Sequence, residues 1–413
     1  MSKLTHLFFV DDLKTYAKNR TNAERQLKVI TEFSNDIGMK FGTDKCAFLA
    51  IERGARELYG NNIHVNGLEI SELKAEDSYK YLGLDEDISY KGELNKERVT
   101  KEYFSRIRKI WNSELYGKNK VQAHNVFAVP VLTGTFGVLD WTKDEISNIN
   151  IKTRKLLTCT GNFHRNSNVD RLDTARDNGG RGLNSVYDVF IARLLSLVEH
   201  LTSTANTHRF LILVLHHEKD RLVRVSHELQ ERLGLHRQNP DNTPISSLAK
   251  NITKQNHLKA WHDKKHHGFI VQKQHAQPGH DKDLSNSWMN LQGTISHSEG
   301  YIFAIQEQEI NTRALQGKRQ HPGDQTFNKK CRYCHSKLED IFHLICSCER
   351  LSASLYLPVR HNEVGKVLYN EIIKLKDNTH QPTIPQLILT TEKLEIWWDI
   401  HIKTVPSVEH NRP

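Results

Sequence analysis

The chain has 413 residues and a hydrophobic content of 37%, which is enough to build folded cores and excludes a disordered chain. Its 58 Lys and Arg residues against 49 Asp and Glu give a net charge of +9, which favours a polyanionic partner such as nucleic acid. No apolar run approaches the roughly 20 residues that cross a bilayer, and no signal-peptide pattern follows Met1, so we expect an intracellular protein with no membrane partner.

The first motif is an apolar run at residues 7–10 that leads directly into Asp11 and Asp12, with an extended pattern behind them. This order predicts a β-hairpin that carries two carboxylates at its tip. Polymerases use such hard oxygen ligands to hold two divalent cations, usually Mg²⁺, during nucleotide addition. Acidic turn residues are also common in proteins without this chemistry.

The next segment predicts an α+β arrangement. Thr21 and Glu24 have the spacing of a capping box for an amphipathic helix that ends at Gly38. Residues 63–70 alternate around an Asn-Gly pair, which is the signal of a type I′ hairpin, and residues 79–83 supply a further short strand.

In this order, the motifs resemble those of the reverse transcriptases of non-LTR retrotransposons. Residues 9–12 look like the aromatic-x-Asp-Asp box of the palm, residues 38–46 like the next palm motif, and residues 79–83 like the primer grip. The resemblance implies that Asp11 and Asp12 bind Mg²⁺ and that Lys45 assists pyrophosphate release. Without the resemblance, Lys45 is an ordinary solvated turn residue.

The same resemblance implies a further metal-binding Asp and nucleotide-binding fingers upstream of the box. The chain begins only ten residues before Asp11. We therefore expect a fragment of a polymerase that is inactive by itself.

A basic, helical region follows and corresponds in position to the thumb. Residues 91–111 predict a helix with an apolar core side and a basic side, including Lys96, that faces solvent or phosphate. Thr142 and Glu145 predict a second capping box. The glycines at 179–182 predict a tight turn before a helix at residues 186–201.

The middle of the chain is less specific. Residues 210–215 predict a buried helix, with a strand as the alternative interpretation. Residues 238–247 predict a linker and residues 299–313 an amphipathic helix. His262 and His266 lie about one helical turn apart and could share a metal, although a basic surface segment is the default interpretation of this histidine-rich stretch.

The most specific motif is Cys331-x2-Cys334-x8-His343-x4-Cys348, a spacing that lets one short loop bind Zn²⁺ tetrahedrally. Four of the six cysteines lie in these eighteen residues, and Cys346 is an alternative to Cys348. Basic residues and one aromatic residue surround the motif and suggest contact with nucleic acid, against an ordinary solvated surface as the alternative: Lys329, Lys330, Arg332, Tyr333 and Lys337.

The motif is followed by helical residues that we expect to break at Pro358, and by Arg360, His361 and Asn362. Together these features resemble the knuckle region of site-specific non-LTR elements that carry a restriction-like endonuclease. Residues 395–399 look like the entry to that nuclease, and residues 411–413 look like the start of its catalytic motif, which the chain does not complete. We therefore assign no cleavage activity.

The sequence thus predicts an α+β fold in which part of a palm (residues 1–90) precedes a helical thumb (91–205) and a helical linker region (206–325). A zinc knuckle (326–370) and the start of a nuclease domain (371–413) complete the predicted order. The predicted function is the nucleic-acid-binding part of an RNA-directed DNA polymerase, with RNA, primer DNA and a chromosomal target in the nucleus as partners. The alternative is a non-catalytic zinc-knuckle protein that binds nucleic acid.

Overall fold

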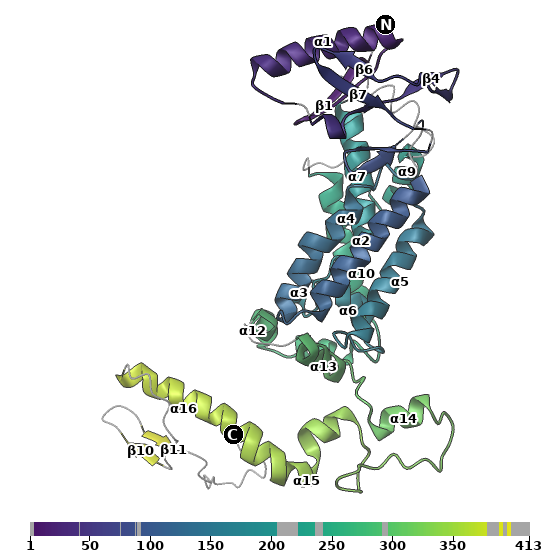
Figure 1. Ribbon diagram of the computed structural model, residues 1–413. Helices are drawn as coiled ribbons and strands as arrows, with labels where there is room; N and C mark the ends of the chain where they lie inside the picture. The colour runs from purple at the N-terminus through teal and green to yellow at the C-terminus, as the bar shows by residue number, and fades with distance from the viewer. Residues whose placement is uncertain are drawn as a thin grey trace. The chain divides into compact units, whose positions relative to one another are not determined.

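The structure is a computed structural model that describes residues 4–40, 42–74, 76–86, 88, 92–204, 222–235, 243–290, 296–377, 388–390 and 395–397. The chain forms two compact units, Met1–Tyr301 and Ile302–Pro413. Both contain helices and small sheets, so the predicted mixed class is confirmed (Figure 1). The predicted helix at 210–215, half of the predicted linker at 238–247, residues 398–399 of the predicted nuclease entry and the tripeptide at 411–413 lie outside the described residues.

The first unit begins with short strands arranged in small sheets. The predicted carboxylate hairpin is present, because β1 (His6–Phe9) pairs antiparallel with β2 (Asp12–Thr15). A three-stranded sheet has the order β3-β7-β6, with β3 parallel to β7 and β6 antiparallel to β7. The strands of this region, besides the first hairpin, are β3 (Ala47–Phe48), β4 (Ala50–Glu52), β5 (Ala55–Glu57), β6 (Ile63–Val65), β7 (Leu68–Glu72), β8 (Tyr79–Tyr81) and β9 (Leu84–Glu86). A polymerase palm stays a prediction for this part of the chain.

Tight turns with positive φ values connect the strands of the hairpins. Asn66 and Gly67 have φ values of 50° and 79°, which confirms the type I′ turn, and Leu82 and Gly83 repeat this pattern between β8 and β9. Val10, at the carboxylate turn, has a φ of 56°. A β-branched residue rarely adopts a positive φ, and such strain is concentrated at functional sites.

Helix α1 (Arg20–Asp36) begins two residues earlier than the predicted capping box requires. Asn19 is the N-cap and accepts a hydrogen bond from the backbone N–H of Asn22 at 3.0 Å. Glu24 forms an ion pair with Arg20 at 3.1 Å, so the capping-box prediction was wrong. The predicted end was right, because Gly38 takes a φ of 72° just after the helix.

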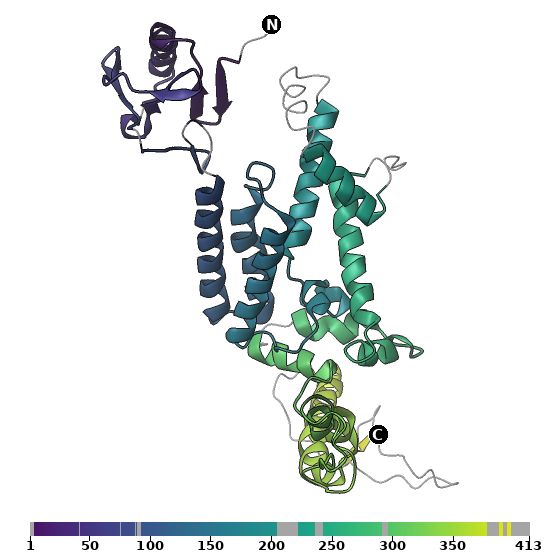
Figure 2. The ribbon, with the colours of Figure 1, turned by 90° about the vertical axis from the view of Figure 1, so that its right-hand side faces the viewer.

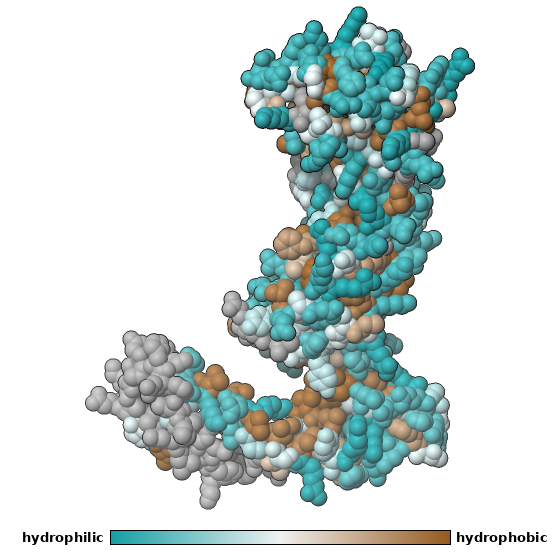
Figure 3. Space-filling view, viewed as in Figure 1, coloured by the Kyte–Doolittle hydropathy of each residue, from teal (hydrophilic) through white to brown (hydrophobic). Residues whose placement is uncertain are grey.

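Four long helices form the core of the first unit: α2 (Gly92–Asn112), α5 (Lys143–Cys159), α7 (Val186–Thr204) and α10 (Ile245–His262). Helix α7 packs against both α5 and α10, and α2 packs against α5 (Figure 2). The fully buried side chains include Tyr103, Ile107 and Trp111 of α2, which recur at the spacing of one helical face. Hydrophilic residues cover most of the bundle surface visible in Figure 3.

Shorter helices connect these four and complete the unit: α3 (Gly117–Ala123), η2 (His124–Ala128), α4 (Val129–Thr133), α6 (Val169–Asp173), η3 (Arg176–Asn178), α9 (Arg224–Leu233), α11 (Phe269–His275), α12 (Lys282–Ser287) and η5 (Trp288–Asn290), with η1 (Thr43–Lys45) among the strands. No helix in the described part of the chain is both long and apolar enough to cross a bilayer.

Two predictions about the bundle have opposite outcomes. The Thr142–Glu145 capping box is confirmed at the start of α5. Lys96 was predicted on the basic side of α2, but only 7% of the residue is exposed, and its ammonium contacts Glu145 and Glu93 at 3.0 Å. These two carboxylates offset the cost of burying the charge of Lys96. Glu145 belongs to α5, a different helix, and the sequence did not predict this contact.

A buried ion cluster joins the predicted glycine turn to α13 (Ser296–Gln306). Glu299 is fully buried and accepts two hydrogen bonds from Arg176, at 3.0 and 2.9 Å, while its Oε1 lies 3.2 Å from Nε of Arg181. Gly179 and Gly182 have φ values of 82° and 79°, which let the chain turn sharply on either side of Arg181.

A second cluster predicts how the stability of the first unit depends on pH. His257 on α10 contacts Asp170 at 3.1 Å and Asp188 at 2.8 Å, and Lys264 contacts Asp170 at 3.0 Å. Burial alone would lower the pKa of His257, but these two carboxylates, helped by Asp173 nearby, raise it to about 10. The hydrogen bond from His257 in turn lowers the pKa of Asp170 to about 2.

Because the pKa of His257 is higher in the folded than in the unfolded protein, its contribution is complete below about pH 6.5 and is lost as the pH rises towards 10. The contribution of Asp170 has the opposite sense, since it is present above about pH 4 and is lost as the pH falls towards 2. We expect His257→Gln to destabilise the protein more at pH 6 than at pH 10 in urea unfolding. An equal effect at both pH values would contradict this assignment.

The second unit continues from the end of α13 into α14 (Arg313–Arg319), η6 (His343–Ser347), α15 (Glu349–Leu351), η7 (Ser352–His361) and α16 (Asn362–Asp377), with a hairpin of β10 (Ile388–Thr390) and β11 (Glu395–Trp397). The single helix predicted at residues 299–313 was wrong, because residues 307–312 separate α13 from α14. The break predicted at Pro358 was also wrong. Pro358 lies inside η7, a π-helix, whose wider turns accommodate a residue without an N–H donor.

Candidate metal centre

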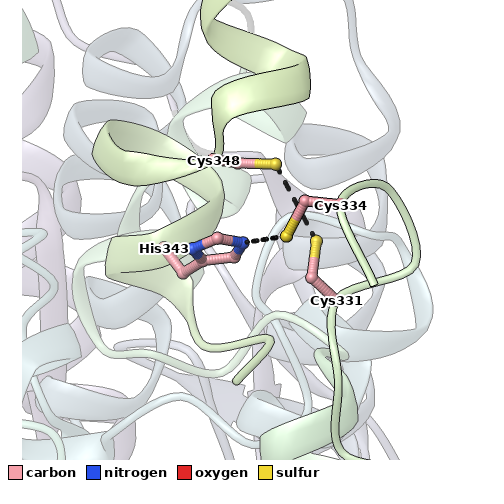
Figure 4. A group of neighbouring side chains, drawn as sticks. All are labelled: Cys331, Cys334, His343 and Cys348. Atoms are coloured by element: carbon pink, nitrogen blue, oxygen red, sulfur yellow. Dashed lines mark hydrogen bonds between the residues drawn. The ribbon is translucent and has the colours of Figure 1, made fainter. Parts of the chain in front are cut away.

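The four residues of the predicted zinc motif lie together in the second unit (Figure 4). One potential ligand atom from each of Cys331, Cys334, His343 and Cys348 lies within 4.8 Å of all the others. In the part of the chain that the structure describes, this is the only such group of three or more Cys, His, Asp or Glu residues. These four residues are called the Cys3His group below.

A short hairpin presents the first two cysteines. Lys330 and Leu338 face each other across an antiparallel bridge, and the backbone N–H of Cys331 donates to the carbonyl of Lys337 at 2.8 Å. Between these strands the chain turns tightly, and the N–H of Tyr333 donates to Sγ of Cys331 at 3.4 Å. The turn therefore directs both the backbone donors and the sulfur atoms towards one point.

The other two residues come from a single helical turn of unusual form. Residues five apart point about 140° away from each other on an α-helix, so His343 and Cys348 would diverge. The segment His343–Ser347 is instead a π-helix, whose hydrogen bonds join residues five apart, and it ends at Cys348 in an extended conformation. This local widening brings the imidazole and the thiol to the same side.

The distances fit a tetrahedral zinc site. Zn–S bonds of about 2.3 Å and Zn–N bonds of about 2.0 Å place tetrahedral ligand atoms roughly 3.5–3.8 Å apart. Sγ of Cys331 lies 3.9 Å from Sγ of Cys348, and Sγ of Cys334 lies 3.3 Å from Nε2 of His343. The Cys3His group can therefore hold a metal such as zinc with little rearrangement.

Exposure distinguishes the two candidate cysteines at the end of the motif. Cys348 is fully buried, whereas Cys346 is exposed and does not belong to the Cys3His group. A metal ligand in a closed structural site is normally shielded from solvent, so the geometry favours Cys348.

Hydrogen bonds prepare the group for metal binding. The backbone N–H of Lys337 and the donors of Ser336 lower the pKa of Cys334 to about 5, which favours the thiolate form that binds a metal. Burial raises the pKa of Cys331, whose proton a bound metal would displace. Nδ1 of His343 lies 3.4 Å from Oγ of Ser347, which helps to orient the ring with Nε2 facing Cys334.

A buried carboxylate, that of Glu339, stabilises the hairpin that carries Cys331 and Cys334. Glu339 is fully buried and accepts hydrogen bonds from the backbone N–H of Arg313 at 2.9 Å and of Arg332 at 2.8 Å. The guanidinium of Arg332 also binds this carboxylate, with its closest nitrogen at 2.6 Å. Arg332 was predicted as part of a nucleic-acid surface, but its charge is already paired within the loop.

The predicted polymerase residues belong to the first unit and are far in sequence from the Cys3His group. Asp11 and Asp12 are exposed at the end of the first hairpin, and Lys45 is exposed at the end of η1. No third acidic or histidine ligand joins the two aspartates in a potential metal group among the described residues. Their assignment as magnesium ligands stays a prediction.

The three motifs attributed to a palm are nevertheless neighbours in space. Lys14 of the first hairpin forms an ion pair with Glu86 of β9, and its ammonium lies 5.2 Å from the ring centre of Tyr81. Burial raises the pKa of Tyr79, and electrostatic interactions with Cys46 and Asp12 raise it further. Residues from all three motifs therefore share one electrostatic environment.

Comparison with known proteins gives short matches to one kind of mobile element. No family model matches the chain. The Pol polyprotein of a type-1 retrotransposable element R2 from Popillia japonica is 36% identical over 80 residues, which are 18% of this chain and 17% of that protein. The Pol polyprotein of the type-2 element R2DM from Drosophila melanogaster is 31% identical over 81 residues, 19% of this chain and 8% of that protein. Over these short segments, the chain is related to the Pol polyproteins of R2 elements, a partial relationship that supports a non-LTR retrotransposon origin.

Proposed function

We propose that this chain is the nucleic-acid-binding portion of a retrotransposon RNA-directed DNA polymerase. The observation that carries the proposal is the Cys3His group, three of whose four residues are buried and which lies on a loop with exposed lysines. Zinc stabilises such a loop whatever it contacts, and the partial relationship to R2 Pol polyproteins favours nucleic acid as the partner. RNA, primer DNA and a chromosomal target in the nucleus are the partners that follow from this proposal.

Catalysis by this polypeptide alone is not part of the proposal. Nucleotide addition requires two divalent cations held by several oxygen ligands. Asp11 and Asp12 would bind Mg²⁺ only with additional carboxylates, which no described residue brings into their group. Lys45 would assist pyrophosphate release only in such a completed site.

The exposed position of Asp11 and Asp12 also favours the alternative, a zinc-knuckle protein that binds nucleic acid and has no catalytic role. Both hypotheses predict binding. They differ in whether the hairpin becomes catalytic when additional carboxylate ligands join Asp11 and Asp12.

Binding is expected to be salt-sensitive and to depend on the lysines of the knuckle. Lys330→Ala and Lys337→Ala should each reduce the slope of log K against log salt by about 1 if each side chain contacts one phosphate. Lys143→Ala, which removes an exposed ion pair with Glu228 outside this unit, is the matched control. Fluorescence anisotropy with a labelled oligonucleotide measures the slopes, and a complete lack of binding at low salt would refute the proposed function.

Primer extension with Mg²⁺ tests whether this polypeptide catalyses nucleotide addition by itself. We expect binding without nucleotide incorporation by the 413-residue polypeptide. Incorporation that Asp11→Ala abolishes would show instead that the polypeptide contains a working polymerase site.

A further inference from the structure

Residues 331–348 are called the metal-binding loop below. Tyr333 is the most exposed aromatic side chain of this loop. It lies between Cys331 and Cys334, and 55% of the residue is exposed. Its backbone is fixed, because its N–H donates to Sγ of Cys331 at 3.4 Å. A large ring is thus displayed to solvent from a rigid turn, although burial would have stabilised it elsewhere.

The hairpin that carries Tyr333 also offers positive charge and a small apolar surface. Lys330 and Leu338 form a non-hydrogen-bonded pair of the antiparallel bridge, so their side chains project from the same face and come close together. Half of Leu338 is exposed, and Lys330 and Lys337 are exposed without an acidic partner in any ion pair of the described chain. Arg332 differs from these lysines, because Glu339 binds its guanidinium.

Single-stranded and duplex nucleic acids offer a protein different surfaces. The bases of a duplex are stacked on each other and offer a protein only their edges, which a helix or ribbon reads in a groove. Unpaired bases expose their faces, and aromatic side chains stack on them regardless of sequence. The loop displays a ring and two cations rather than a helix shaped for a groove.

From this geometry we propose that the metal-binding loop binds single-stranded nucleic acid, with an unpaired base stacked on Tyr333 and the flanking phosphates at Lys330 and Lys337. The inference rests on the proposed function and specifies its ligand. Sequence preference should be weak, because every base has a face that can stack.

The test compares single-stranded and duplex binding by the zinc-loaded full chain. Base stacking on an aromatic side chain contributes about 1–3 kcal/mol, so Tyr333→Ala should weaken binding of a single-stranded oligonucleotide by about 5- to 150-fold. Tyr333→Phe should retain the affinity, because the ring remains. The affinity for a duplex of the same sequence should change less than 3-fold, roughly the scatter of a neutral substitution.

Tyr301→Ala is the matched control, because Tyr301 is 59% exposed and lies outside the metal-binding loop. A 2-aminopurine base in the oligonucleotide should lose fluorescence on binding to the wild type and to Tyr333→Phe, but not to Tyr333→Ala. DNA and RNA versions of the strand show which backbone the loop prefers. Zinc content is measured for every variant, and Tyr333→Leu replaces Tyr333→Ala if the alanine variant loses its metal.

The outcomes separate this inference from the proposed function. No binding to either form refutes both. Binding that Tyr333→Ala leaves unchanged, or weakens equally for single strand and duplex, overturns the stacking inference and leaves the proposed function standing. A loss confined to the single strand, with retention by Tyr333→Phe, supports it.

Discussion

Cys331→Ser is expected to reduce the zinc content of the purified protein from about one equivalent to nearly none. Cys331 is fully buried, and its sulfur lies 3.9 Å from that of Cys348. Zinc contributes roughly 10–16 kcal/mol to the folding of small zinc domains at neutral pH, so loss of one thiolate removes the main stabilising interaction of the loop. Metal analysis after dialysis measures the content directly.

Cys346→Ser is the matched control, because Cys346 is exposed two residues from Cys348 and lies outside the Cys3His group. It should retain its zinc, whereas Cys348→Ser should behave like Cys331→Ser. Limited proteolysis should cleave the loop between Lys329 and Arg350 much faster in the metal-free variants. Full zinc content in Cys331→Ser, or its loss in Cys346→Ser, would show that a different set of ligands binds the metal.

The largest effect on the stability of the first unit is expected from Glu299→Gln. The carboxylate is fully buried and contacts both Arg176 and Arg181, and Arg181 is itself fully buried. Removing one partner of a buried ion cluster leaves an uncompensated charge, which typically costs about 3–5 kcal/mol. The amide has nearly the same shape, so the loss measures charge rather than packing.

Urea unfolding followed by circular dichroism measures this loss as a shift of the midpoint at an unchanged slope. Glu228→Gln is the control, since Glu228 pairs with Lys143 at 2.8 Å and both side chains are nearly half exposed. Such exposed pairs contribute little to stability, because water screens their attraction. An equal loss of stability in both variants would contradict the inference that the buried ion cluster stabilises the packing of α13.

Local signals in the sequence predicted local structure well. The Asn66-Gly67 turn, the Thr142 capping box and the end of α1 at Gly38 each depend on neighbouring residues alone, and each is present. The start of α1 was misplaced because Asn19 and Thr21 are both good caps, and the sequence does not say which one the chain uses.

Contacts between distant segments were harder to predict. Lys96 has the sequence context of a surface residue, and only the packing of α2 against α5 brings Glu145 to it. Glu299 similarly meets Arg176 across 123 residues of chain. A charged residue can be buried when a distant partner offsets its desolvation, and sequence spacing carries no information about that partner.

The candidate metal centre shows what each level of information determined. Spacing alone identified Cys331, Cys334 and His343, because short loops constrain which residues can bind one ion. The sequence left open whether Cys346 or Cys348 completes the set. Tertiary structure decided in favour of Cys348, because the π-helical turn at His343 buries that thiol beside Cys331 and leaves Cys346 in solvent.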